Sequence, residues 1–172
     1  MIMTRLLQLL SGKRAVILDK WLTMLLAHFS PETLRLFQRE KNPFANPVAY
    51  QLHRGLEAMF TLLLQGEGGQ KGADAVDEVV RLMALQDLAP SQALAFVFFL
   101  KQVVREELAQ ELEDLSLHPE LLDLESRIDG LALLGFDAYM QRREKLYDIK
   151  VQEMKNRISG LLRRAGIELT NP

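Results

Sequence analysis

A single helical pattern runs without a break from about His118 to Ala165, and it constrains this chain more than any other feature. His118, Pro119 and Glu120 form a suitable start, because the first helical residue needs no N–H donor and a carboxylate favours the positive helix end. Gly166 follows as a fitting stop. The pattern far exceeds the roughly 11-residue average of globular helices. It predicts a long C-terminal helix of the kind found in coiled coils.

Apolar residues in the second half of this helix recur every seven positions. They form two rows, in which Glu144 is the one polar exception: Met140, Tyr147, Met154 and Leu161, then Val151, Ile158 and Ala165. A seven-residue repeat keeps such a stripe facing one partner helix along its length. The partner is either an earlier helix of this chain or a second copy, and the helix length and basic flanks favour a second copy. We therefore expect a parallel homodimer with its seam along Met140, Tyr147, Val151, Met154, Ile158 and Leu161.

Helical periodicity also dominates the rest of the chain, and no alternating run with hairpin turns predicts a strand. Further helices are expected at about 4–10, 14–29, 31–39, 47–65, 74–86 and 92–113. The glycine-rich stretch 66–72 is interpreted as a flexible linker, since it lacks the Gly-Lys-Ser/Thr end of a phosphate-binding loop. The predicted fold class is all-α, with a helical bundle in residues 1–140 and an extension of the long helix in residues 141–172.

Two segments of the bundle carry more specific expectations. Residues 93–100 are apolar all round, so their helix should be enclosed on nearly every side. Phe44 lies between two Asn-Pro steps, which suit turns and helix caps, and it is expected to pin its loop to the core. Asn46 and Asp74 are the expected caps of the helices that follow them.

Length, composition and charge narrow the class of protein. The 172 residues fit one domain with a sizeable core, and the chain contains no cysteine. The longest apolar run is far shorter than the roughly 20 residues that span a bilayer, and no secretory signal begins the chain. The net charge of -2 hides an acidic stretch at 104–130 and a basic C-terminal helix. We expect a soluble, cytoplasmic protein without a membrane span, and no motif supports nucleic-acid binding.

No residue pattern predicts a reaction, a metal site or a cofactor. His28, His53 and His118 are isolated, and only His53 has a carboxylate, Glu57, at helical spacing. His53 is also the one candidate axial ligand for haem, but a half-buried structural histidine is the better interpretation. The serines lie at expected helix boundaries, and no nucleophile elbow is present. We expect a protein that is not an enzyme and has neither metal nor cofactor.

Three stretches, in order along the chain, resemble one known family. They are residues 39–48 with Lys41-Asn42-Pro43-Phe44-Ala45-Asn46-Pro47, residues 80–108 with Gln86-Asp87 and Pro90-Ser91-Gln92-Ala93, and residues 126–147 with Ser126-Arg127-Ile128-Asp129, Phe136-Asp137-Ala138-Tyr139-Met140 and Arg143-Glu144-Lys145-Leu146-Tyr147. From about Val16 to Arg164, the chain is similar to the RsbRD-type N-terminal sensory domains of RsbT co-antagonists, the stressosome proteins related to RsbR.

The resemblance implies a signal-input domain. Related RsbR N-terminal domains have a globin-like helical fold without haem and pair as dimers. In full-length relatives the last helix leads into a STAS domain that meets kinase and phosphatase partners. This sequence stops at Pro172 without such an output domain, so it is expected to be either a fragment or a stand-alone family member.

Two functions follow as hypotheses. The first is a sensory or regulatory domain that changes its dimer or terminal helix when a protein partner or a small ligand binds. Such a ligand would occupy a pocket lined by Trp21, His53, Phe60, Phe96, Phe99 and Tyr139, although ordinary core packing is the alternative role for each aromatic residue. The second is a protein–protein adaptor or scaffold that senses no small molecule.

Overall fold

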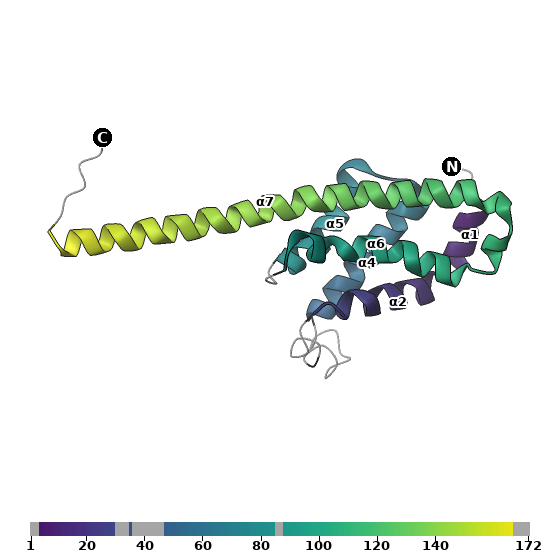
Figure 1. Ribbon diagram of the computed structural model, residues 1–172, viewed down its shortest axis with the longest axis horizontal. Helices are drawn as coiled ribbons and strands as arrows, with labels where there is room; N and C mark the ends of the chain where they lie inside the picture. The colour runs from purple at the N-terminus through teal and green to yellow at the C-terminus, as the bar shows by residue number, and fades with distance from the viewer. Residues whose placement is uncertain (1–3, 30–34, 36–46, 85–87, 167–172) are drawn as a thin grey trace. The chain divides into compact units, whose positions relative to one another are not determined.

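The computed structural model describes residues 4–29, 35, 47–84 and 88–166. Regular structure in these ranges is entirely helical, which confirms the expected all-α fold class. The helices are α1 (Arg5–Gly12), α2 (Arg14–Leu26), α4 (Pro47–Gln65), α5 (Gly69–Ala84), α6 (Pro90–Glu107) and α7 (His118–Arg164), with short 3-10 turns η1 (Glu111–Glu113) and η2 (Leu115–Leu117) (Figure 1). Apart from Arg35, the expected helix at 31–39 lies outside the described residues, as do the Asn46 cap and the Phe44 plug.

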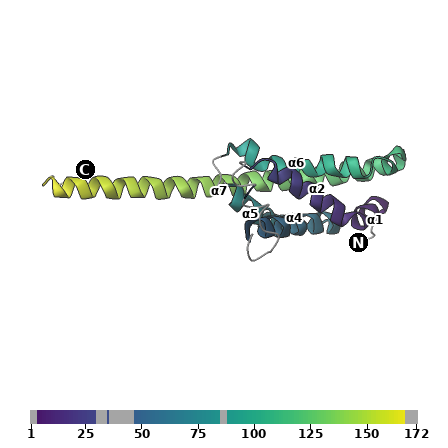
Figure 2. The ribbon, with the colours of Figure 1, turned by 90° about the horizontal axis from the view of Figure 1, so that it is seen from below.

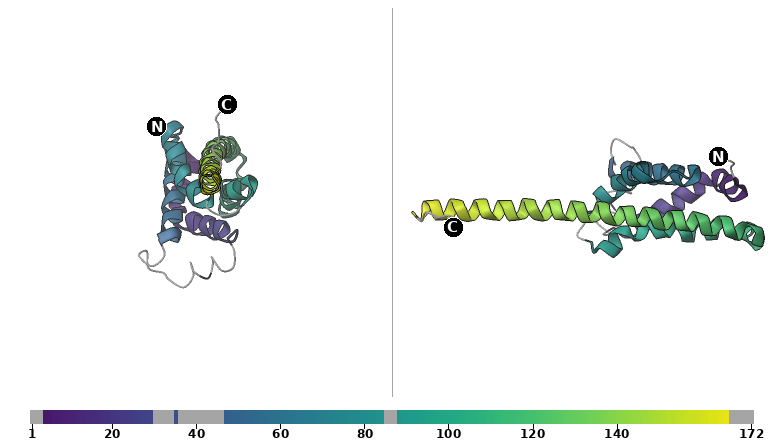
Figure 3. Two further views of the ribbon diagram at one scale, coloured as in Figure 1. Left: turned by 90° about the vertical axis from the view of Figure 1, so that its left-hand side faces the viewer. Right: turned by 90° about the horizontal axis from the view of Figure 1, so that it is seen from above.

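The chain divides into two compact units, Met1–Tyr139 and Met140–Pro172, and α7 contributes to both. In the first unit α4 packs on α5, and α2 packs on both α4 and α6 (Figure 1). Figure 2 shows α6 running beside the first part of α7, where ion pairs join the two helices. The left view of Figure 3 places α4 and α5 on one side of that part of α7 and α6 on the other.

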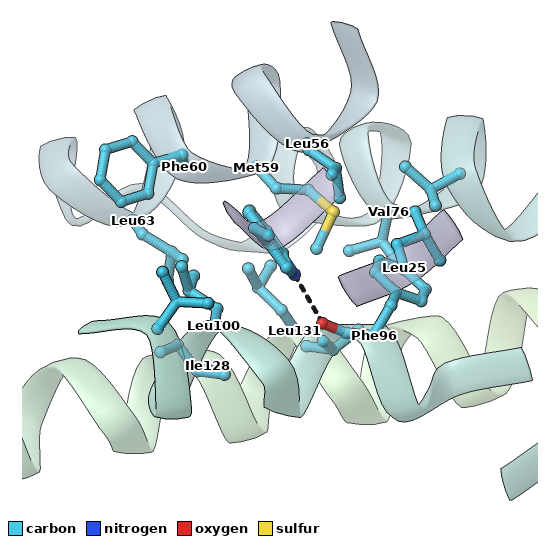
Figure 4. Close-up of a cluster of buried hydrophobic side chains, with 14 of the residues drawn as sticks. Leu25, Leu56, Met59, Phe60, Leu63, Val76, Phe96, Leu100, Ile128 and Leu131 are labelled. Atoms are coloured by element: carbon cyan, nitrogen blue, oxygen red, sulfur yellow. Dashed lines mark hydrogen bonds between the residues drawn. The ribbon is translucent and has the colours of Figure 1, made fainter. Parts of the chain in front are cut away.

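The core of the first unit is built from the apolar faces of every helix in it. Trp21 of α2 is fully buried in it, and its Nε1 donates a hydrogen bond to the carbonyl oxygen of Phe96 at 2.6 Å. Leucine, methionine and phenylalanine side chains from α4, α6 and α7 belong to the same buried cluster, part of which is drawn in Figure 4. The bond matters because an indole N–H buried without an acceptor would cost on the order of 1–3 kcal/mol.

Glycines at two helix contacts leave space that a valine side chain of a neighbouring helix approaches closely. A Cβ on Gly55 of α4 would lie 2.5 Å from Cγ2 of Val79 on α5, and a Cβ on Gly135 of α7 would lie 3.0 Å from Cγ1 of Val76. The helices are therefore packed backbone to side chain at these points. A methyl group at Gly55 would clash with Val79, and one at Gly135 would require a small shift of Val76.

The predicted start of α5 was wrong. The helix begins at Gly69, five residues before Asp74, so Asp74 is not its cap, and only residues 66–68 connect it to α4. Gly66 and Gly69 adopt φ of 66° and 62°, which make the tight turn. Gly72 is buried, and its absent side chain leaves room for Leu131. These glycines therefore form a tight turn and a close helix contact. The flexible linker expected at 66–72 is reduced to residues 66–68.

Two expectations for α6 were also wrong. The helix ends at Glu107 and not near Glu113, and the chain reaches α7 through η1 and η2. Nor is the segment 93–100 enclosed on nearly every side, because Phe98 is 48% exposed to solvent. The opposite faces, including Phe96 and Val97, are buried as expected. Other helices cover most of this segment, and the face that carries Phe98 stays apolar and open.

Candidate interaction surface

The aromatic residues proposed for a ligand pocket are mainly core residues. Trp21, Phe60, Phe96 and Tyr139 are each at most 1% exposed, within one continuous apolar cluster. Tyr139 donates its hydroxyl hydrogen to the carbonyl oxygen of Leu88 at 2.8 Å. In the described part of the chain, every buried polar side-chain atom has a hydrogen-bond partner. These residues therefore offer an incoming ligand no free polar group.

The other two proposed pocket residues lie elsewhere. Phe99 is half-buried and packs on the imidazole of His28, with ring centroids 4.8 Å apart. His53 is half-buried on α4 and lines a shallow surface cleft with Arg14 and Glu57. The structure thus brings Trp21, Phe60 and Phe96 together but does not join His53 or Phe99 to them in one of the described cavities. A ligand pocket at all six stays a prediction.

Charged side chains gather where α6 turns into α7. Lys20 pairs with Glu107, Lys13 pairs with Glu111 at 2.9 Å, and Arg5 pairs with Asp114 at 2.6 Å. The hydrogen bond from Lys13 lowers the pKa of Glu111. The pairing with Glu107 raises the pKa of Lys20. These groups hold the two N-terminal helices on the acidic turn, so their shifted pKa values reflect ion pairing and not a reaction centre.

Two further carboxylates fix the first part of α7. Glu125, the one buried charged residue in the described ranges, receives two hydrogen bonds from Arg105 at 2.7 and 2.9 Å. Glu120 accepts a hydrogen bond from the backbone N–H of Leu6 at 2.7 Å. It thereby supplies negative charge at the N-terminus of α1, whose own first turn has no acidic residue. The start of α7 is tied to both α1 and α6.

No three His, Asp or Glu side chains converge on a possible metal position within the described ranges. His118 contacts the carbonyl oxygen of Leu112 at 3.0 Å, at the boundary where the sequence placed it. Across the described residues, no helix combines the length and apolarity needed to cross a membrane.

The open face of α6 forms one wall of an apolar groove whose other wall is α7. Its volume is about 780 Å³, and the lining consists of Pro90, Ser91, Leu94, Phe98, Asp129, Ala132, Leu133 and Phe136. Three of the large side chains are well exposed: Phe98 at 48%, Leu133 at 70% and Phe136 at 47%. Asp129, the only charged member of the lining, pairs with Lys101 at 2.7 Å. Exposed apolar surface of this kind marks interaction sites in soluble proteins.

Sequence reasoning missed this groove because it treated residues 93–100 as wholly enclosed. One available signal was Leu133, which lies seven residues before Met140 and so continues the seam row backward.

The second unit carries the seam residues, and all of them are exposed. They range from 36% for Met140 to 64% for Leu161, with Tyr147, Val151, Met154 and Ile158 between these values. Nothing in the described part of this unit covers the stripe. An exposed apolar row with a seven-residue repeat is typical of a helix that pairs with another helix.

A scan against family models matches residues 15–154 to the RsbT co-antagonist protein rsbRD N-terminal domain. The chain belongs to this family. The resemblance drawn from three stretches is therefore confirmed. Searches of curated proteins and of solved structures return no match.

The match to the rsbRD N-terminal domain begins at residue 15 and ends at residue 154. It includes both walls of the apolar groove and the seam as far as Met154, and it leaves out α1. Membership in this family makes the chain a sensory or regulatory domain of the stressosome type, with protein–protein signalling as its setting. The two apolar surfaces are the candidate interaction site of such a domain.

Proposed function

We propose that this chain is a non-enzymatic signal-input domain that acts as a homodimer and transmits its state through α7. The observation that carries the proposal is the seven-residue apolar row on the second unit, exposed along its whole length. An isolated helix in water has little stability of its own, because most helical stability comes from burying an apolar face. A second helix that covers the apolar row would supply this burial. The proposed setting is the cytoplasm, and the globin-like character of the bundle belongs to the same proposal.

The dimer is tested by light scattering coupled to gel filtration at tens of micromolar protein. The unmodified chain is expected to elute as a dimer. Ile158→Asp places a charge in the seam and should shift the equilibrium toward monomer, since burying an unpaired carboxylate is unfavourable. Ser159→Asp, one residue further on and outside the two apolar rows, is the matched control and should leave the dimer intact. A monomeric unmodified chain at this concentration contradicts the proposal.

A second candidate, the adaptor without a small ligand, has an observation in its favour. The aromatic residues expected to line a pocket are packed in the core with their polar atoms bonded to the protein. A partner protein would then be the only input. Thermal-shift measurements with small metabolites, redox cofactors and haem separate the two: a sensor should gain stability with one of them. An adaptor should instead retain a stoichiometric protein partner from native lysate without any added ligand.

A further inference from the structure

The cleft that contains His53 differs from the apolar groove because most of the residues that line it are polar. It lies in the first unit, where the end of α1, the first half of α2 and the middle of α4 meet, and its volume is about 490 Å³. Pockets that bind small molecules typically measure roughly 300–1,000 Å³. Five polar or charged residues line this polar cleft: Ser11, Arg14, Asp19, His53 and Glu57.

Arg14 is fixed in the wall of the polar cleft. Its Nη2 donates hydrogen bonds to Oε1 of Glu57 at 3.2 Å and to the hydroxyl of Thr61 at 2.7 Å. The guanidinium also lies 5.8 Å from the centre of the Phe60 ring. Arg14 therefore neutralises the charge of Glu57 but uses one of its two carboxylate oxygens. The other oxygen, Oε2, accepts no hydrogen bond from the described residues.

Asp19 contributes a negative charge that no described side chain neutralises. The lysines nearest to it in sequence are paired with other carboxylates, Lys13 with Glu111 at 2.9 Å and Lys20 with Glu107. The nearby arginine is paired with Glu57, as described above. Within the described ranges, the carboxylate of Asp19 itself has neither a hydrogen bond nor an ion pair. The polar cleft thus has one uncompensated negative charge when its histidine is neutral.

His53 adds a further free hydrogen-bonding group. It precedes Glu57 by four residues, so both lie on the same face of α4. Its ring is half-buried and has no hydrogen-bond partner among the described residues. A neutral imidazole keeps one nitrogen as an acceptor. Three acceptors from two helices are therefore available in the polar cleft, beside the apolar side chains of Ala15 and Leu18.

We propose that the polar cleft binds a small organic ammonium ion, an amine with a short apolar chain. An ammonium group carries three N–H donors and the positive charge that the lining lacks. These donors match Asp19, Oε2 of Glu57 and His53, and the apolar chain can lie on Ala15 and Leu18. An anionic ligand is disfavoured, because the lining is negative overall and its one arginine is already paired.

The inference rests on the proposed function in one respect, since it names the class of input that a signal-input domain of this kind would receive. Part of the polar cleft lies outside the family match, which begins at residue 15, because Ser11 and Arg14 precede it. A ligand here would contact both the end of α1 and α4. The backbone N–H of Leu6 on α1 donates to the carboxylate of Glu120 at the start of α7, 2.7 Å away. Binding would therefore hold α1 on the bundle and against α7.

Nuclear magnetic resonance of the full, ¹⁵N-labelled chain tests the proposal with n-butylammonium as the probe. Amide shifts should saturate at residues around the polar cleft, with a dissociation constant of about 10 mM or lower, as expected for so small a ligand. Butyrate and n-butanol have the same number of carbon atoms but are anionic and neutral, respectively, and neither should bind there. Sodium chloride at equal ionic strength should not reproduce the shifts.

Two variants locate the binding site. Asp19→Asn removes the uncompensated charge at an exposed position and should raise the dissociation constant at least about tenfold, because a charge-assisted hydrogen bond is lost. His53→Ala should raise it at least about threefold. Asp137→Asn is the matched control, since Asp137 is an exposed aspartate of the same unit that does not line the polar cleft. It should leave the constant unchanged.

The outcomes separate this inference from the proposed dimer. No saturable shift with n-butylammonium, or equal affinity in Asp19→Asn and the unmodified chain, would overturn the ammonium site. Equal binding of butyrate or n-butanol would overturn it too, because charge would then not determine recognition. Light scattering on the same samples reports the oligomeric state. A dimer that does not bind the probe leaves the homodimer standing, whereas a monomer that binds it contradicts the homodimer alone.

Discussion

Tyr139 and Tyr147 lie about two turns apart on the same helix, and their surroundings differ completely. Tyr139, the last residue of the first unit, is fully buried and bonded to the carbonyl oxygen of Leu88. Tyr147 is 59% exposed, and the Arg143 guanidinium lies over its ring, 5.6 Å from the centroid. The first unit completes its core with its own helices, whereas the second unit carries apolar side chains that nothing in its described residues covers. The difference locates where the proposed partner would bind.

The largest expected effect comes from the centre of the first unit. Trp21→Ala removes a fully buried indole and should lower the free energy of unfolding by about 3–5 kcal/mol. Tyr147→Ala in the second unit should change it by less than about 0.5 kcal/mol at dilutions where the protein is monomeric. Urea unfolding followed by circular dichroism measures both, because Trp21 is the only tryptophan and its fluorescence is lost in the variant. Similar losses for the two variants would abolish the contrast between the units.

A glycine-to-alanine substitution should have a smaller effect on stability, and the effect should have opposite signs in the two units. Gly55→Ala places a methyl group 2.5 Å from Cγ2 of Val79 and should cost about 1–3 kcal/mol. Gly160→Ala meets nothing within 4 Å on an exposed helix and should stabilise that helix by about 0.5–1 kcal/mol. Urea unfolding reports the first change, and slower amide hydrogen exchange around residue 160 reports the second. A stabilising Gly55→Ala would mean that α4 and α5 are not in close contact there.

The smallest expected effect is a loss of thermal stability at acidic pH. Hydrogen bonding from Lys13 lowers the pKa of Glu111, and hydrogen bonding from Ser116, then from Arg5, lowers the pKa of Asp114. A carboxylate whose pKa is depressed by folding stabilises the fold above its unfolded value, and that contribution is lost as the pH falls through the folded value. The melting temperature should therefore decline below about pH 4.5.

The double variant Glu111→Gln, Asp114→Asn tests this origin of the acid sensitivity. Its melting temperature should be somewhat lower at neutral pH and should fall less steeply than that of the unmodified protein between about pH 5 and pH 3. The paired change Glu153→Gln, Asp148→Asn in the second unit serves as a control for the loss of two carboxylates. An unchanged slope in the first variant would mean that the acidic turn does not contribute to acid stability.

The local sequence pattern was sufficient to predict where helices lie and to predict one of the two apolar surfaces, the seam on α7. The start of α4 at Pro47 and its end at Gln65 followed from a proline suited to the first turn and a clear apolar period. The restart at His118 followed from similar residues. The seam was readable because a seven-residue repeat is a property of one helix alone, and its exposure needs no other element of the fold.

The groove, the start of α5 and the end of α6 were decided by tertiary structure. Gly72 lies within α5, and the side chain of Leu131, 59 positions later, occupies the space beside it. The chain leaves α6 at Glu107, where Lys13, between α1 and α2, and Lys20 of α2 hold the acidic turn. Phe98 is exposed, and Phe96 is buried, because neighbouring helices cover the face of α6 that carries Phe96 and leave the face of Phe98 open. The sequence by itself determined which segments are helical, since period and caps act over a few residues; which faces are covered depends on contacts between residues far apart in the chain, and these leave no local pattern.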